Sequence, residues 1–246
     1  MTTFGLDVRC EEGQRQLMAG QYLEAIETLS EAEKFVWEAK DYSLLSRLYL
    51  PLQEARRQAR QRCGEGMVNL GLVARGPGDV LDSAAILGPI GQGQVLVAGW
   101  GSIAPALEVR RLARERKIYV EAFLGAVFPL IGGERAVVVE ALEEDVLPDV
   151  RPRSRDELVR LLPERALVFS AEELREGAVR GSVETFARVS EMWERLHLPF
   201  LLEADAQTDP IRKMEGYRKT IRVDSACELA HQGLAAVAKE MAKVSG

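Results

Sequence analysis

The chain has 246 residues, of which 47% are hydrophobic and 28% are charged. A chain of this length and composition buries enough apolar surface to fold without disulfides or bound metals. Long disorder, collagen-like repeats and disulfide-dependent mini-proteins are therefore excluded. Lys and Arg number 32 and Asp and Glu number 38, giving a net charge of −6. We therefore expect neither nucleic acid nor a membrane surface as a partner.

The cysteines Cys10, Cys63 and Cys227 lie far apart and form no CxxC or finger-like spacing. This pattern predicts free thiols in a reducing compartment and no structural zinc site. We expect neither a bound metal nor a cofactor. The first residues lack the basic and apolar segments of a signal peptide. The weakly charged stretches Gln94–Val109 and Ile118–Ile131 are too short to span a bilayer. We expect a soluble cytoplasmic protein.

The first part of the chain is predicted to be helical, because apolar residues recur at steps of three and four. Gly20 marks a turn between two antiparallel helices. A third helix is predicted over Tyr42–Arg62, with Asp41 as its N-cap and Gly64 as its stop. Pro51 lies inside this helix and predicts a kink or break.

The segment from Gly13 to Ala32, with small residues where two helices approach and larger ones between them, resembles one tetratricopeptide repeat. This resemblance implies a surface on the N-terminal helices for a protein partner. The next turn of the same kind, Asp41-Tyr42, comes too early for the period of about 34 residues in that family. An ordinary helical hairpin is the favoured interpretation, and a peptide-binding repeat is the alternative.

Strands and helices alternate after residue 64. The predicted strands are Met67–Ala74, Gln94–Ala98, Lys117–Phe123, Arg135–Glu140, Arg165–Phe169 and Pro199–Leu202. The predicted helices are Asp79–Leu87, Pro105–Arg116, Asp156–Leu162, Ser182–Leu196 and a long one over Asp209–Lys243, with a break expected near Gly216 or Gly233. This alternation predicts an α/β fold with a mostly parallel sheet, covered by helices on both faces and preceded by an N-terminal α-helical cap.

Two domains follow from this pattern, a helical cap at residues 1–64 and an α/β domain at residues 65–246. The link between Lys117–Phe123 and Arg135–Glu140 is too short for a crossover helix. These two strands are therefore predicted to be antiparallel, unless the intervening loop simply leaves the sheet. Leu142–Arg155 is predicted to be an irregular excursion.

The sharpest local feature is the turn Gly99-Trp100-Gly101-Ser102, which follows a buried strand and opens a helix with Pro105 in its first turn. Glycines allow close approach of a ligand, and a helix start offers free N–H groups and a partial positive charge. The turn therefore predicts an anion site. The indole of Trp100 would wall the pocket, stack on the ligand or plug the crevice. A purely structural turn is the alternative.

Gly99-x-Gly101-x-x-Ala104 resembles the fingerprint of dinucleotide-binding Rossmann folds. That resemblance implies that Glu121, predicted at the end of the next strand, would bind a ribose. The chain departs from the family after Phe123, where the second half lacks its helix.

The same turn, preceded by helices, is also similar to that of the sugar isomerase (SIS) family of phosphosugar-binding domains. This resemblance implies ligand contacts from Ser170 after a later strand, and from Ser182 and Thr185 at the next helix start. It also implies that His231, on the last helix, is the candidate catalytic histidine. The compact Ser-x-Ser-Gly-x-Thr turn of the family is replaced here by an insertion, Ala171–Gly181.

The other polar motifs favour structural roles. His197 precedes a predicted strand, and Glu228 with His231 is a single helical pair where a metal site in a helix bundle needs more ligands. No GxSxG elbow or Ser/His/Asp pattern is present, so covalent hydrolase chemistry is disfavoured and the catalytic residues remain unassigned. The basic residues between Arg212 and Lys219 predict a solvated helix face, with a patch for a phosphate or an acidic partner as the alternative.

The leading hypothesis is an α/β protein that binds a small phosphorylated ligand, a phosphosugar or a nucleotide-like molecule, at the strand-end glycine turn. The candidate ligand-binding residues are Gly99, Trp100, Gly101, Ser102, Glu121, Ser170, Ser182 and Thr185. The alternative is a non-catalytic adaptor that binds a protein through its N-terminal helices. Whether the protein is an enzyme and whether it forms a homo-oligomer stay open.

Overall fold

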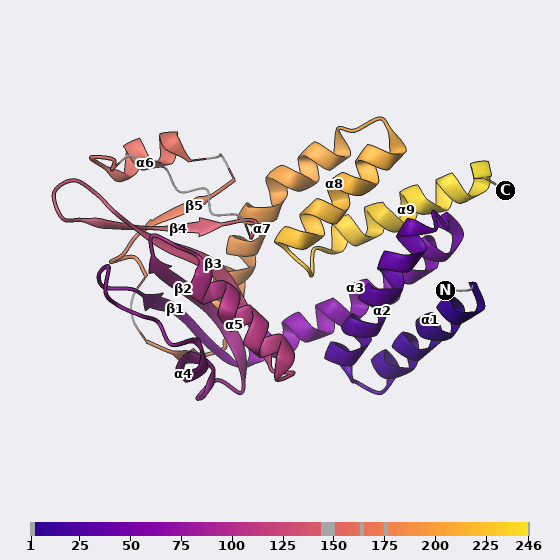
Figure 1. The fold of residues 1–246 in the computed structure, drawn as a ribbon, viewed down its shortest axis with the longest axis horizontal. Coiled ribbons are helices and arrows are strands. Elements are labelled where there is room, and N and C mark those ends of the chain that lie inside the picture. Colours follow the sequence, from indigo (N-terminus) through magenta and orange to yellow (C-terminus); the bar gives the residue numbers. More distant parts are fainter. Residues whose placement is uncertain (1–2, 144–150, 163–164, 175–176, 246) are drawn as a thin grey trace. The chain divides into compact units, whose positions relative to one another are not determined.

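The computed structural model describes residues 3–143, 151–162, 165–174 and 177–245. It divides into two compact units, a helical unit of residues 1–60 with 197–246 and an α/β unit of residues 61–196. Two helices, α3 (Tyr42–Glu65) and α7 (Val183–Asp205), run from one unit into the other (Figure 1). The sequence predicts one boundary near residue 64. The structure has a second one at residues 196–197, which assigns the C-terminal helices to the helical unit.

The helical unit consists of α1 (Thr3–Met18), α2 (Tyr22–Glu38), most of α3, the end of α7, α8 (Pro210–Val223) and α9 (Glu228–Ser245). The predicted turn at Gly20 is confirmed, and its φ of +75° explains the glycine. The N-cap at Asp41 is also confirmed, because its carboxylate accepts a hydrogen bond from Leu44 N–H at 2.9 Å. Pro51 lies inside α3, which continues beyond it.

Two predictions for the C-terminal part are wrong. Pro199–Leu202 is not a strand but part of α7, because a short apolar run fits a buried helix as well as a strand. The last helix breaks at residues 224–227 and not at either predicted glycine. Gly216 and Gly233 instead allow close helix packing, since an added Cβ would lie 2.7 Å from the Cβ of Ala204 and 2.5 Å from the ring of Tyr217, respectively.

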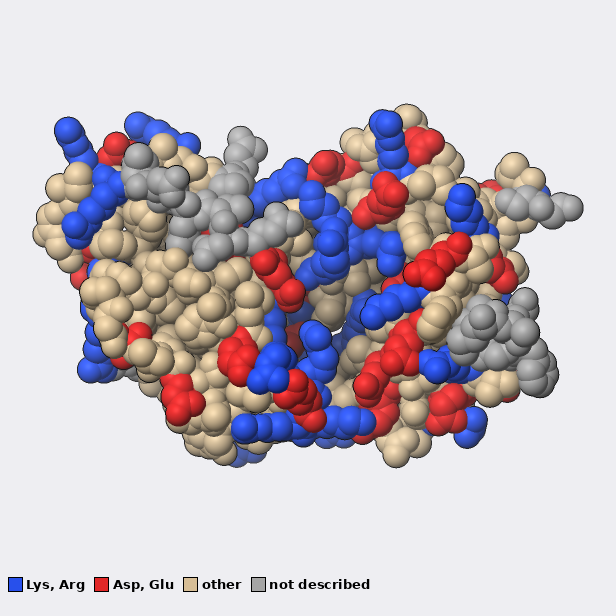
Figure 2. Space-filling view, viewed as in Figure 1, with Lys and Arg blue, Asp and Glu red and all other residues tan. Residues whose placement is uncertain are grey.

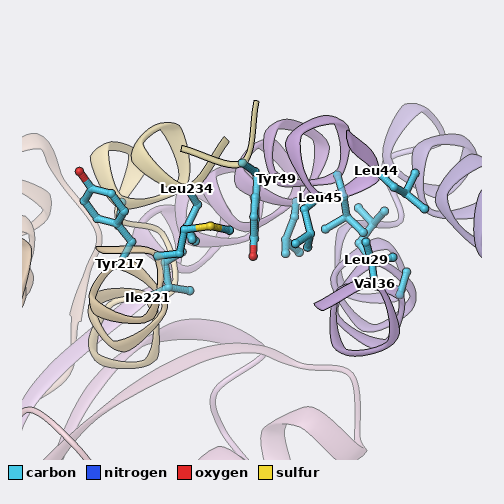
Figure 3. Close-up of a cluster of buried hydrophobic side chains, with 14 of the residues drawn as sticks. Leu29, Val36, Leu44, Leu45, Tyr49, Tyr217, Ile221 and Leu234 are labelled. Carbon is cyan, nitrogen blue, oxygen red and sulfur yellow. The ribbon is translucent and has the colours of Figure 1, made fainter. Parts of the chain in front are cut away.

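The core of the helical unit joins helices from both ends of the chain. Figure 3 shows Leu29 and Val36 of α2 packing beside Leu44, Leu45 and Tyr49 of α3, and these beside Tyr217, Ile221 and Leu234 of α8 and α9. Burial of such side chains contributes about 1.5–3 kcal/mol each, so the N-terminal helices depend on the C-terminal ones for their stability. None of the described helices has both the length and the apolarity needed to cross a bilayer.

The α/β unit contains a six-stranded sheet in the order β5-β4-β3-β2-β1-β6. The strands are β1 (Met67–Val73), β2 (Gln92–Trp100), β3 (Tyr119–Pro129), β4 (Arg135–Glu140), β5 (Leu167–Ser170) and β6 (Val179–Arg180). β1, β2 and β3 are parallel neighbours, whereas β4 pairs antiparallel with both β3 and β5, and β6 pairs antiparallel with β1. The sheet is therefore mixed and not mostly parallel. The predicted antiparallel pair is confirmed as β3 and β4.

Helices flank this sheet on both faces. Val95 and Val97 of β2 pack in one cluster with residues of α4 (Ser83–Leu87) and α5 (Ala104–Glu115), and α6 (Arg155–Leu161) packs against β4 and β5. Neighbouring strand residues point to opposite faces. On the other face, Trp193 of α7 stacks on Phe123 with ring centroids 4.2 Å apart. Half of the predicted excursion at residues 142–155, namely 144–150, lies outside the described residues.

Candidate functional site

The glycine turn at residues 99–102 lies where β2 ends and α5 begins, as predicted. Gly99 is buried, and a Cβ there would lie 2.6 Å from the carbonyl oxygen of Ser102. Gly101 is exposed and has a φ of +62°, the left-handed region that favours glycine. The side chain of Trp100 is partly exposed. Both glycines are thus explained by the geometry of a tight turn.

Amide donors at this turn and at the start of α5 are already used. Gly101 N–H donates to Val127 O at 2.9 Å, and Ala104 N–H donates to Ser102 Oγ at 3.1 Å. Pro105 has no N–H, and Ala106 N–H donates to Ile103 O at 3.0 Å. An anion at a helix N-terminus needs unengaged N–H groups. The first turn of α5 does not offer them, so the geometry favours the structural role of this turn over an open anion cradle.

Replacing Gly101 by alanine is expected to destabilise the protein by about 1–2 kcal/mol, the usual cost of a left-handed backbone for a residue with a Cβ. A Cβ at Gly101 would meet no atom within 4 Å, so the chain still folds and the loss comes from strain alone. Urea unfolding would measure it. Gly76→Ala is the matched control, because Gly76 is equally open but has no positive φ. Equal stability of the two variants would contradict this account.

Ser170 lies at the same end of the sheet as the glycine turn. In the ladder, Trp100 pairs with Val127, Val127 with Val137, and Val137 with Phe169, the residue before Ser170. Three strand spacings separate the two positions, which is about 14 Å. A single phosphate cannot contact both, so the turn and Ser170 do not form one phosphate site.

Glu121, Ser182 and Thr185 lie at the opposite end of the sheet. Glu121 is near the start of β3 and pairs with Gln94, six residues before the row of Trp100, which is about 20 Å away along the strand. Gly181 N–H bonds Gly66 O just before β1, and Ser182 caps α7 by accepting from Thr185 N–H at 3.2 Å. The eight predicted residues therefore do not converge. Glu121 was misplaced because β3 extends to Pro129, well beyond its predicted end.

A groove of about 660 Å³ lies beside β5, and sequence reasoning did not find it. Its polar lining comes from α6, from α7, from the end of β5 and from the residues after it, namely Arg155, Ser170, Glu172, Glu173, Arg188 and Arg195. Arg188 and Arg195 are seven residues apart on α7, so they share a face of that helix. This seven-residue spacing is the feature of the sequence from which the arginine pair of the groove could have been predicted.

The groove has two kinds of arginine. Arg155 is engaged, because it pairs with Glu173 at 2.9 Å and donates to Val168 O at 2.8 Å. Glu173 also accepts from Ser170 N–H at 2.9 Å, and this backbone bond, followed by Arg155, lowers the pKa of Glu173. Arg188 and Arg195 have no ion-pair partner in the described part of the chain. Both side chains are exposed.

Arg155 and Glu173 also cover the open edge of the sheet. β5 is an edge strand, and such strands present unpaired backbone groups to other chains. Here the carbonyl of Val168 and the amide of Ser170 are satisfied by these two side chains. The edge is thus closed to strand addition, while the neighbouring groove stays open.

The basic run on α8 has mostly structural partners. Lys213 donates to Asp205 O, Arg218 pairs with Glu33 at 2.9 Å, and the ammonium of Lys219 lies 5.3 Å from the ring centre of Phe200. In Figure 2, basic and acidic side chains are mixed toward the far right, and Lys and Arg gather near the middle of the view. These contacts support the prediction of a solvated helix face over that of a phosphate patch.

His231 lies in the helical unit and is completely buried, whereas Glu228 is exposed. Burial, followed by the neighbouring charge of Arg56, lowers the pKa of His231 to about 3, so its imidazole is neutral at physiological pH. Its Nδ1 has no hydrogen-bond partner among the described residues. The role implied by the SIS resemblance, contact with a sugar, does not fit a fully buried ring.

His197 belongs to a buried polar cluster of the helical unit. Its Nδ1 lies 2.7 Å from Oδ2 of Asp224, and the other carboxylate oxygen, Oδ1, lies 2.8 Å from Arg60 Nη2. Burial alone lowers the pKa of His197, but hydrogen bonds with Asp224 and Cys227 outweigh it and raise the pKa to about 9. Burial raises the pKa of Asp224, yet Arg60 and His197 together hold it well below its usual range. His197 is therefore a cation at neutral pH.

Comparison of the chain with protein-family models, with curated proteins and with solved structures gives no match in any of the three. The resemblances to the SIS, Rossmann and tetratricopeptide families consequently stay predictions.

Proposed function

We propose that the α/β unit binds a small molecule that carries a phosphate, and that the groove beside β5 holds this phosphate. The observation that carries the proposal is the pair Arg188 and Arg195, which line the groove without an ion-pair partner in the described part of the chain. A guanidinium offers planar, paired donors that match two phosphate oxygens.

Ser170 supplies the neutral contact in this proposal. Its oxygen accepts from Glu173 N–H at 3.2 Å, which leaves the hydroxyl proton free to be donated to a ligand oxygen. Arg155 and Glu173 hold Ser170 in place by fixing the end of β5. Glu172 also lines the groove. A carboxylate there repels a second phosphate nearby and accepts hydrogen bonds from hydroxyl groups, so a monophosphate with a polyhydroxylated body is the best match.

The experiment is a thermal-shift and calorimetric titration with inorganic phosphate, sugar monophosphates and nucleotides. A ligand at a hundred times its dissociation constant stabilises the folded state by about 2.7 kcal/mol. We expect this stabilisation for a sugar monophosphate with the unaltered chain, and its loss in the double variant Arg188→Gln, Arg195→Gln.

The matched control is the double variant Arg114→Gln, Arg116→Gln, which removes the same charge from exposed positions at the end of α5. It should bind as the unaltered chain does. The proposal fails if no phosphorylated ligand stabilises the protein at millimolar concentration, or if both double variants weaken binding equally.

The second candidate function is that of an adaptor which binds a protein through its N-terminal helices. It is favoured by the exposed apolar side chains of Met18, Phe35 and Leu50, which are 88%, 41% and 55% exposed. Removing these helices would destroy the shared core, so the test uses point variants. Phe35→Glu and Leu50→Glu should abolish capture of a protein partner, while Leu229→Glu on α9, equally apolar and 61% exposed, should retain it.

A further inference from the structure

Both helices that connect the two units are tied to one buried carboxylate. α3 passes out of the helical unit after Arg60, and α7 enters this unit at His197. These two boundary residues are the ones that bind Asp224, through Arg60 Nη2 at 2.8 Å and His197 Nδ1 at 2.7 Å. The carboxylate thus joins the two chain crossings within the helical unit.

Asp224 is itself held rigidly. Its backbone N–H donates to Thr220 O at 2.9 Å at the end of α8, and its carboxylate accepts from Ala226 N–H at 3.0 Å. Its side chain is 3% exposed, and those of Arg60 and His197 are 12% and 13% exposed. Ion pairs shielded from water in this way are screened much less than surface pairs.

The charges around His197 come from the connection between α8 and α9 and from α3. Asp224 and Cys227 face it from the connection between α8 and α9, and Arg60 approaches the same carboxylate from α3. Farther away, Arg56 of α3 lies 3.3 Å from Nε2 of His231 on α9. The imidazole of His231 is neutral at pH 7. The carboxylate of Asp224 is therefore the acid that pairs with the imidazolium of His197 in the described surroundings.

We propose that Asp224 is a proton-dependent clamp, which holds α3 and α7 together where both cross the edge of the helical unit and which loosens when His197 loses its proton. The charged form of His197 makes a charge-assisted hydrogen bond, about twice as strong as a neutral one. After deprotonation Nδ1 can still donate, but the ionic attraction is gone while Arg60 remains bound. α7 is then the helix that is released.

Amide hydrogen exchange of the full chain tests the clamp. Exchange is compared at pH 7 and pH 9.5 after correction for the intrinsic rate. We expect protection in peptides covering residues 56–65 and 192–202 to fall by about tenfold or more at pH 9.5, in line with a pKa near 9 for the imidazole, while the strands of the α/β unit keep theirs.

His197→Asn keeps a neutral donor near the position of Nδ1 and removes the titration. This variant should show low protection at these two crossings at both pH values. Asp224→Asn should behave in the same way. Arg218→Gln is the control, because it breaks the ion pair with Glu33 elsewhere in the same unit. The proposal is overturned if His197→Asn leaves protection at the crossings unchanged, or if pH 9.5 lowers protection uniformly along the chain.

Discussion

Replacing Trp193 by alanine is expected to lower the free energy of unfolding by about 3–5 kcal/mol, the range for deleting a large buried aromatic side chain. Trp193 is 5% exposed, and its ring stacks on Phe123 with an interplanar angle of 25°. Its indole N–H donates to the side-chain oxygen of Gln94 at 3.3 Å, and Gln94 is 1% exposed. The variant therefore creates a cavity and also leaves a buried amide oxygen without this donor, which adds to the loss.

Urea unfolding followed by circular dichroism is the appropriate measurement, because the change removes a fluorescent side chain. Val183→Ala on the same helix is the control. Val183 is 90% exposed, so its truncation should change stability by no more than about 0.5 kcal/mol. A loss below about 1 kcal/mol for Trp193→Ala would show that α7 is not anchored to the sheet by this side chain.

Raising the pH from 6.5 through 9 is expected to remove about 3 kcal/mol of stability. The folded pKa of His197 is about 9 and its ordinary value is 6.5, so the shift is about 2.5 units at about 1.36 kcal/mol each. Because the folded state holds the proton more tightly, this contribution is complete below pH 6.5 and is lost as the pH rises through 9. The 13% exposure of the side chain leaves little screening by water.

The second histidine of the chain acts in the opposite direction. The pKa of His231 is about 3 in the folded state, so the unfolded chain binds a proton there that the folded chain excludes. Stability therefore falls as the pH drops below 6.5, and the two histidines together place a maximum near that pH. Urea unfolding between acidic pH and pH 9 measures the loss of stability on each side of this maximum, the acid limb and the alkaline limb. His197→Asn should flatten only the alkaline limb, and a variant that kept that limb would refute the assignment to His197.

Local signals in the sequence predicted many elements, and long-range contacts decided the rest. Arg135–Glu140 has its predicted bounds because a continuous apolar run follows the turn at Gly132 and Gly133. Pro199–Leu202 was wrong because four apolar residues fit either kind of element. The two-residue β6 carries no periodic signal at all. The second unit boundary followed from which helix faces pack together, and periodicity does not specify a packing partner.

At the candidate site too, local sequence signals predicted the turn, and long-range contacts decided what it can bind. Gly99 and Gly101 were located correctly as a strand-to-helix turn. Whether its amides were free depended on Val127, a residue of the next strand that no local motif identifies. Ser170 was found from a family resemblance, but its arginine neighbours Arg188 and Arg195 come together with it only through the path of α7.

The division of the chain has a consequence for biosynthesis. The α/β unit is continuous, so it can fold as soon as residue 196 has left the ribosome. The helical unit needs residues from both ends, and its first helices emerge long before α8 and α9 are translated. During that interval the apolar faces around Leu45 and Tyr49 lack their C-terminal partners. Nascent chains of this protein should therefore bind chaperones through their N-terminal helices until α8 and α9 have emerged.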